Sequence, residues 1–205
     1  MTNEFALFRE PLEFRANDDG TVSVQGYAAK FNTLSHPFGN NYYESIAPGA
    51  FTRALNEKND VNLLVNHEGL PLASTKSGTL QLSQDSVGLR MNATLDAQDP
   101  DVQKIVPKLK RGDLSEMSFG FMVSGTKQSY KQEDGKNIRQ LDDVNLYDVS
   151  VVSKGQYPDT SVKLRSFEEA FKEVEPDPRD ELKRLKESNK DLSEDKYRVN
   201  FIRIG

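Results

Sequence analysis

Two short stretches decide how this chain folds and what it can do: Val61-Asn62-Leu63-Leu64-Val65-Asn66-His67-Glu68 and Leu114-Ser115-Glu116-Met117-Ser118-Phe119-Gly120-Phe121. Each joins an apolar pattern of strand length to a side chain that catalysis can use. A serine hydroxyl is nearly inert until a neighbouring imidazole accepts its proton, so a serine and a histidine on rigid strands are the least machinery that acyl transfer needs. The two stretches therefore offer a base and a nucleophile.

Outward from these stretches, alternation and turn signals predict a mainly β domain with two helices. Hairpins are expected for residues 12–16 with 21–29, around Asp18-Asp19-Gly20, and for residues 79–83 with 89–95. Residues 48–55 favour a short helix, and a second helix begins after Asp99, is bent or shortened by Pro107 and stops at Gly112. Residues 144–152 favour a last strand. Residues 32–46, 68–71 and 131–136 are expected to be loops.

Composition divides the chain in two. Its 205 residues, 36% of them hydrophobic, suffice for one domain of ordinary size and a less well packed remainder. After about Leu164 the sequence becomes highly charged, with a break at Glu175-Pro176-Asp177-Pro178 and few apolar anchors beyond it. We therefore expect a domain at residues 1–165 and a charged, helical or disordered extension at residues 166–205. The extension is a tether to assembly partners, a segment removed by self-cleavage, or a frayed terminus.

Charge and rare residue types exclude several classes of function. A net charge of -5 and a pI near 5.2 argue against nucleic-acid binding, which usually needs a basic face. The absence of cysteine excludes disulfides, thiolate nucleophiles and cysteine-based zinc sites, and two histidines are too few for a multi-histidine metal centre. The first residues lack the pattern of a signal peptide or membrane span. We expect a soluble, intracellular protein with no cofactor, no metal and no membrane partner.

A family resemblance extends over nearly all of residues 20–165, with its motifs in the right order. It is carried by His67 after an apolar strand, Gly69-Leu70-Pro71-Leu72-Ala73, the hairpin at 79–89, a helix leading into Arg111-Gly112-Asp113-Leu114-Ser115-Glu116-Met117-Ser118-Phe119-Gly120-Phe121, Asp148-Val149-Ser150-Val151-Val152, Tyr157-Pro158-Asp159-Thr160, and the upstream segments 26–31 and 44–51. In these features the chain resembles the prohead proteases of tailed bacteriophages, of the HK97 type.

The resemblance implies a serine endopeptidase that works in the host bacterial cytoplasm, inside the immature capsid or prohead. Its substrate would be the scaffold or the scaffolding segment of the major capsid protein, and commonly the protease itself. The implied fold is a small closed β-barrel with peripheral helices, shared with herpesvirus assembly proteases. A homo-oligomer is possible for such a protein.

The family pattern places the nucleophile at Ser118 and the base at His67. Without that context, Ser118 would be interpreted as a small residue packed in a strand, and His67 as a histidine satisfied by a nearby carbonyl. The rival nucleophile, Ser115, lies in a polar turn that suits a local hydrogen bond to the backbone. The rival base, His36, precedes Pro37 in a polar loop, and catalysis needs its groups held within about 0.5 Å of productive geometry.

Asp148 is carried over from the family pattern as the third member, a carboxylate that orients the imidazole. A strand carboxylate with a purely structural hydrogen bond is the competing interpretation. Other candidates for the third position remain open, namely Glu68, Glu116, Asp142, Asp143 and, because related viral proteases use a histidine there, His36.

Two other classes of function compete with the protease. An inert internal scaffolding or binding protein could keep the same fold and work through its charged extension, although the intact His67 and Ser118 count against it. A different hydrolase such as an esterase is disfavoured, because no Gly-x-Ser-x-Gly elbow precedes a helix.

Overall fold

The computed structural model describes residues 4–8, 12–37, 41–123 and 125–153. The expected boundary at residue 165, the extension at 166–205 and the Tyr157-Pro158-Asp159-Thr160 motif lie outside the described residues. In chain order the elements are β1 (Glu4–Phe8), β2 (Glu13–Ala16), β3 (Thr21–Lys30), β4 (Tyr42–Ile46), α1 (Thr52–Glu57), β5 (Asn62–Val65), β6 (Glu68–Ser74), β7 (Leu80–Gln84), β8 (Gly88–Asp96), α2 (Pro100–Arg111), β9 (Glu116–Met122), the 3₁₀ helix η1 (Gly125–Lys127), β10 (Gln128–Glu133), β11 (Lys136–Leu141) and β12 (Asn145–Val152).

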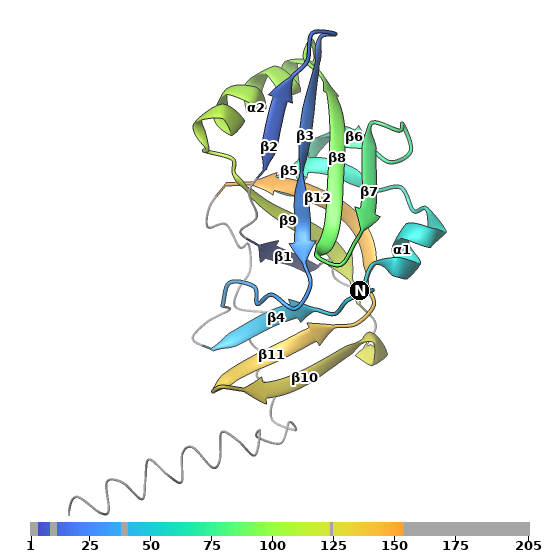
Figure 1. Ribbon diagram of the computed structural model, residues 1–205, viewed down its shortest axis with the longest axis vertical. Helices are drawn as coiled ribbons and strands as arrows, with labels where there is room; N and C mark the ends of the chain where they lie inside the picture. The colour runs from blue at the N-terminus through green and yellow to red at the C-terminus, as the bar shows by residue number, and fades with distance from the viewer. Residues whose placement is uncertain (1–3, 9–11, 38–40, 124, 154–205) are drawn as a thin grey trace, which may run out of the picture.

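The described strands form three sheets (Figure 1). A five-stranded sheet has the order β1-β9-β12-β5-β6, a four-stranded sheet the order β2-β3-β8-β7, and a three-stranded sheet the order β10-β11-β4. The protein is therefore mainly β with few helices, as predicted. No closed barrel is found in the described residues, contrary to the expectation, because a barrel requires hydrogen-bonded pairing to continue from strand to strand around a circle, and here it stops at the edges of each sheet.

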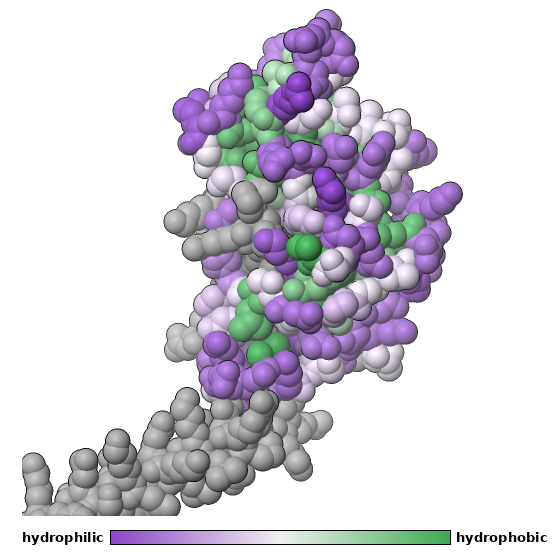
Figure 2. All heavy atoms as spheres, viewed as in Figure 1, coloured by the Kyte–Doolittle hydropathy of each residue, from purple (hydrophilic) through white to green (hydrophobic). Residues whose placement is uncertain are grey.

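The core lies between the five-stranded and four-stranded sheets. Strand β8 alternates as a half-buried strand should, with Leu89, Met91, Ala93 and Leu95 inward and polar residues outward. From the other sheet, Met117, Phe119 and Phe121 of β9 join the same buried cluster. The face of the molecule shown in Figure 2 is correspondingly mostly hydrophilic, with only small, separate apolar areas.

Aromatic rings stiffen the core directly behind β9. Phe119 meets Phe51 edge to face at 5.4 Å between ring centroids and Phe121 at 5.0 Å, and Phe51 stacks on Phe31 at 6.1 Å. All three phenylalanines at positions 51, 119 and 121 are fully buried. Such pairs add about 0.5–1.5 kcal/mol each beyond the area they bury. The strand that carries Ser118 is therefore anchored by its core-facing residues.

The predicted helices are present, with one difference. Asp99 caps α2 by accepting a hydrogen bond from the Asp101 N–H at 2.8 Å, and Gly112 ends it in the left-handed conformation with φ 78°. Pro107 was expected to bend or shorten this helix, and it does not shorten it, because α2 continues past Pro107 to Arg111. Within the described ranges, neither helix has the length and apolar character needed to cross a membrane.

Three expected loops contain strands. Residues 68–71 open β6, where Pro71 is tolerated because β6 is the edge of its sheet. Residues 42–46 of the expected loop 32–46 form β4, which pairs in parallel with β11. Residues 131–136 are the tip of the β10–β11 hairpin, whose turn residues Asp134 and Gly135 have φ 49° and 70°.

Candidate catalytic site

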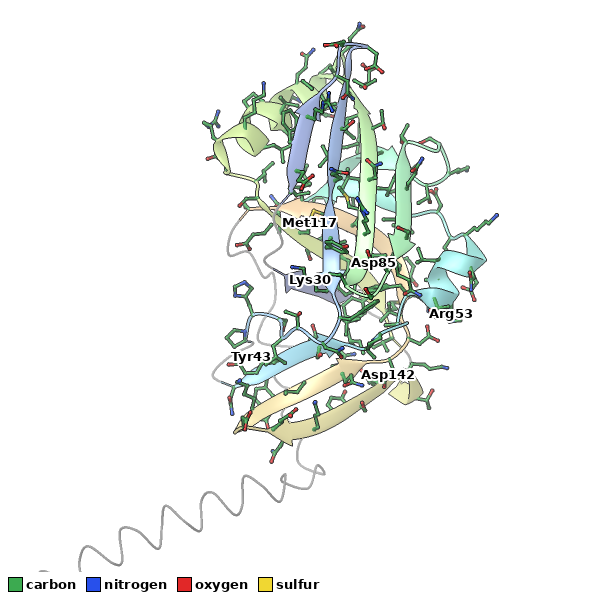
Figure 3. All side chains as sticks on the ribbon, in the orientation of Figure 1. Lys30, Tyr43, Arg53, Asp85, Met117 and Asp142 are labelled. Atoms are coloured by element: carbon green, nitrogen blue, oxygen red, sulfur yellow. The ribbon has the colours of Figure 1, made fainter. Side chains whose placement is uncertain are left out.

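Strand register places three polar residues on one face of the five-stranded sheet. Ser118 of β9 is the direct partner of Ser150 on β12, and Gly120 is the partner of Asp148. Direct partners project to the same side of a sheet, as do residues two apart in one strand. Ser118, Ser150 and Asp148 therefore share a face, and the neighbouring Met117, labelled in Figure 3, faces the core.

His67 reaches this face from the turn between β5 and β6. Strand β5 runs parallel to β12, with Ser150 opposite Leu64 and Val151 opposite Val65. The two turn residues, Asn66 and His67, both have left-handed backbones, with φ 52° and 61°. Two successive residues of positive φ make the tight hairpin turn whose twist matches the flanking strands. The sequence predicted a strand ending before His67, and the hairpin supplies the turn that directs its side chain.

The strained turn is held against β12 by hydrogen bonds on both of its residues. The Asn66 N–H donates to the Val151 carbonyl at 3.0 Å, and the Ser153 N–H donates to Asn66 Oδ1 at 3.2 Å. The His67 N–H donates to Ser150 Oγ at 3.1 Å. A residue that carries a Cβ costs of order 1 kcal/mol or more in the left-handed region. The conformation therefore persists only where surrounding contacts hold it.

The three side chains named from sequence form one hydrogen-bonded chain. His67 Nδ1 lies 2.6 Å from Asp148 Oδ1, and His67 Nε2 lies 2.7 Å from Ser118 Oγ. Because an ionised carboxylate only accepts, the proton belongs on Nδ1, which leaves the Nε2 lone pair facing the serine hydroxyl. Ser118 is 3% exposed, and the side chains of His67 and Asp148 are each 12% exposed. This is the arrangement in which an imidazole can accept a serine proton.

The rival residues lie elsewhere or have other partners. Ser115 is exposed just before β9, and His36 lies between β3 and β4, where its carbonyl accepts a hydrogen bond from Ser35 Oγ. Glu68 and Asp142 are exposed, whereas Asp143 accepts both hydrogen bonds of Arg53 Nε. Glu116 is buried on β9, two residues before Ser118. Asp148 is the carboxylate bonded to the His67 ring in the structure.

Sequence reasoning missed Ser150, which completes the site. Its side chain is fully buried, and its Oγ accepts the His67 N–H and donates to Asp148 Oδ1 at 2.9 Å. The only sequence signal was its position two residues after Asp148 on a predicted strand, which puts both on one face. In the part of the chain that the structure describes, acidic and histidine side chains form no group of three suited to a metal ion.

Comparison with known proteins gives one match. A family model described as the caudovirus prohead serine protease matches residues 10–173, which include all three candidate residues and most of the chain. Searches of curated proteins and of solved structures found no match, and the expected relation to herpesvirus assembly proteases is therefore not shown. On the family match, the chain belongs to the caudovirus prohead serine proteases.

Proposed function

We propose that this chain is a serine endopeptidase of capsid maturation, with Ser118 as nucleophile, His67 as general base and Asp148 as the carboxylate that orients the imidazole. The observation that carries the proposal is the chain of two hydrogen bonds through the His67 ring, which lies 2.6 Å from Asp148 Oδ1 and 2.7 Å from Ser118 Oγ. It lies within the part of the chain that matches the prohead protease family.

Each group has one task in the proposed reaction. Ser118 Oγ attacks the scissile carbonyl carbon while His67 Nε2 takes its proton, and the protonated imidazole then gives that proton to the leaving amine. Water repeats the sequence on the acyl-enzyme, releasing the new carboxyl end and restoring the serine. Asp148 stays ionised throughout, keeps the proton of the neutral ring on Nδ1 and stabilises the imidazolium that forms.

The family context supplies the substrate class. Prohead proteases act on capsid or scaffold proteins, and we propose that this chain cleaves the scaffold or the scaffolding segment of the major capsid protein inside the prohead. Cleavage of its own chain near the start of the extension at 166–205, and assembly into a homo-oligomer, belong to the same proposal. The competing function is an inert scaffolding protein with this fold.

Replacing Ser118 by alanine tests the proposal, and the chain offers a matched control. Ser118→Ala loses one hydroxyl and should lower the rate of peptide hydrolysis by at least about 10⁴-fold with the thermal midpoint little changed. Ser115→Ala makes the same change three residues away on an exposed residue and should keep full activity. The measurements are labelling by a fluorophosphonate and fragment masses after co-expression with the capsid protein of the same phage.

The same pair of variants separates protease from scaffold. An inert scaffold protein would show neither labelling nor capsid-protein cleavage in the unmodified chain. Normal cleavage by a folded Ser118→Ala protein would reject Ser118 as the nucleophile, and loss of cleavage in Ser115→Ala alone would point to the rival serine.

A further inference from the structure

The strand that carries Ser118 has the chain's own N-terminal strand on its outer side. In the five-stranded sheet β9 lies between β12 and β1, and β1 ends the sheet. Strand β1 pairs with β9 in antiparallel fashion over five positions, with Leu7 directly opposite Ser118 and Phe5 opposite Gly120. Because β12 occupies the other side of β9, the edge at which another strand can lie beside Ser118 is the one that β1 takes.

An extended peptide is well suited to that edge. Peptides commonly bind proteins by adding a strand to a sheet, where main-chain hydrogen bonds give affinity whatever the side chains are. A strand paired with β9 runs about 4.8 Å from it, which brings a substrate backbone alongside the residue that must attack it. With β1 in place, Ser118 is only 3% exposed.

Strand β1 is separable from the part of the chain shared with the family. The family match begins at residue 10, so β1 is the one described strand that precedes it. His67, Ser118, Asp148 and Ser150 all lie inside the match. Strand β1 is also a sheet edge with a single neighbouring strand, and such edges open more readily than central strands do.

We propose that the outer edge of β9 is the docking edge for an extended peptide substrate, and that β1 occupies this edge as an internal competitor. The proposal rests on the proposed function, because it assumes that Ser118 is the nucleophile. Substrate enters as an antiparallel strand in the place of β1, with the residue opposite Ser118 presenting the scissile carbonyl. Apparent substrate affinity is then the intrinsic affinity reduced by the fraction of molecules in which β1 has left.

Weakening β1 should therefore activate the protein. In the full chain, the double substitution Ala6→Pro/Leu7→Pro removes two consecutive N–H groups, one of which points toward β9, and fixes φ at both positions. Phosphonylation by a fluorophosphonate reports access to Ser118, because the hydroxyl proton passes to His67 Nε2 while an Oγ–P bond forms and fluoride leaves. We expect it to accelerate at least about tenfold, and a folded variant that reacts at the unmodified rate would overturn the proposal.

A matched control separates this effect from general loosening of the fold. Strand β2 is another N-terminal edge strand, at the end of the four-stranded sheet and not paired with β9. Arg15→Pro/Ala16→Pro should weaken β2 in the same way and leave the labelling rate unchanged. Equal acceleration in both variants would mean that the fold has loosened as a whole, which would also overturn the proposal.

The unmodified chain gives a second test that needs no variant. The peptide aldehyde acetyl-Glu-Phe-Ala-leucinal copies residues 4–7, with its reactive carbon at the residue that faces Ser118. Ser118 Oγ adds to that carbon and the hydroxyl proton ends on the aldehyde oxygen, so nothing leaves. Amide hydrogen exchange should then show that residues 4–8 lose protection and β12 keeps it. Retained protection of residues 4–8 in the adduct would contradict the proposal.

Ser118→Ala keeps the two hypotheses apart. If it abolishes labelling while the β1 substitutions do nothing, the proposed function stands and the competitor role of β1 fails. If labelling persists in Ser118→Ala, the proposed nucleophile fails first, whatever β1 does.

Discussion

Ser150 is fully buried, and its hydroxyl contacts both the backbone of His67 and the carboxylate of Asp148. It accepts the His67 N–H and donates to Asp148 Oδ1, so it fixes the backbone of one residue and the carboxylate of the other. We expect Ser150→Ala to lower kcat about tenfold or more with KM nearly unchanged, because the imidazole is then less firmly oriented. Steady-state kinetics on a cleavable peptide measures this split between kcat and KM.

Ser35→Ala is the control for losing a buried serine whose hydroxyl makes two hydrogen bonds. Ser35 Oγ donates to the His36 carbonyl and accepts the Glu44 N–H, both at 2.9 Å, far from β12 in the chain. Both variants should lose about 1–3 kcal/mol of unfolding free energy for the donors and acceptors left unpaired. Only Ser150→Ala should lose kcat, and equal kcat in the two variants would reduce Ser150 to a packing role.

Sequence reasoning reached Ser118, His67 and Asp148 because each ends or lies within a strong strand pattern and matches the family motif. It could not find Ser150, since its contact with His67 depends on the parallel pairing of β12 with β5, two strands more than 80 residues apart in the chain. Nor could it choose Asp148 over Asp143 from the residues alone, because only the fold shows that Asp143 is bonded to Arg53.

At the scale of elements, the β5–β6 hairpin is what turns an apolar strand into a support for His67. Asn66 precedes His67 in the left-handed region, where a residue with a Cβ is strained and glycine is not. Asn66→Gly and Asn66→Ala both lose the bond to the Ser153 N–H, so their difference isolates the conformational cost. We expect Asn66→Ala to be less stable than Asn66→Gly by about 1 kcal/mol in urea unfolding. Equal stability would show that the turn has relaxed.

Elements with local signals were predictable, and elements defined by a distant partner were not. The β2–β3 and β7–β8 hairpins and the caps of α2 follow from residues close in the chain. Strand β6 looked like a loop because Gly69 and Pro71 suggest one, yet an edge strand accepts both. The residues before β4 are polar, and β4 forms as a strand because it pairs with β11, about 95 residues later in the chain.

At the scale of the whole molecule, the three-stranded and five-stranded sheets are connected where the chain leaves β11 and enters β12. Arg53 of α1 donates from Nε to both oxygens of Asp143, at 3.1 and 3.0 Å, and from Nη2 to Asn145 Oδ1 at 2.7 Å. Lys127 of η1 adds a longer contact with Asp143, at 3.6 Å. Figure 3 labels Arg53 and Asp142, which lie on the same side of the molecule. This cluster ties α1 to the connection between the three-stranded sheet and β12.

The cluster makes stability depend on pH in a predictable direction. The hydrogen bonds from Arg53 lower the pKa of Asp143 below the ordinary value for an aspartate, outweighing the opposing effect of burial. A carboxyl whose pKa is lower in the folded state stabilises the fold above its unfolded pKa of about 3.9, and this contribution is lost as pH falls through the folded value. Asp143→Asn should therefore cost about 1 kcal/mol of unfolding free energy at pH 7, a modest figure because Arg53 is 40% exposed.

Urea unfolding at pH 7, 5 and 3 checks both the size and the direction. The gap between the unmodified protein and Asp143→Asn should stay constant from pH 7 to 5 and narrow toward pH 3, because the carboxyl becomes protonated and the native contact loses its charge. Asp142→Asn alters the adjacent, exposed carboxylate, which accepts a hydrogen bond from Gln140 Nε2, and should change stability by less than about 0.5 kcal/mol. A gap that widens at low pH would mean that the ionised form of Asp143 is less favourable in the folded than in the unfolded chain, and would contradict the stabilising role of its pairing with Arg53.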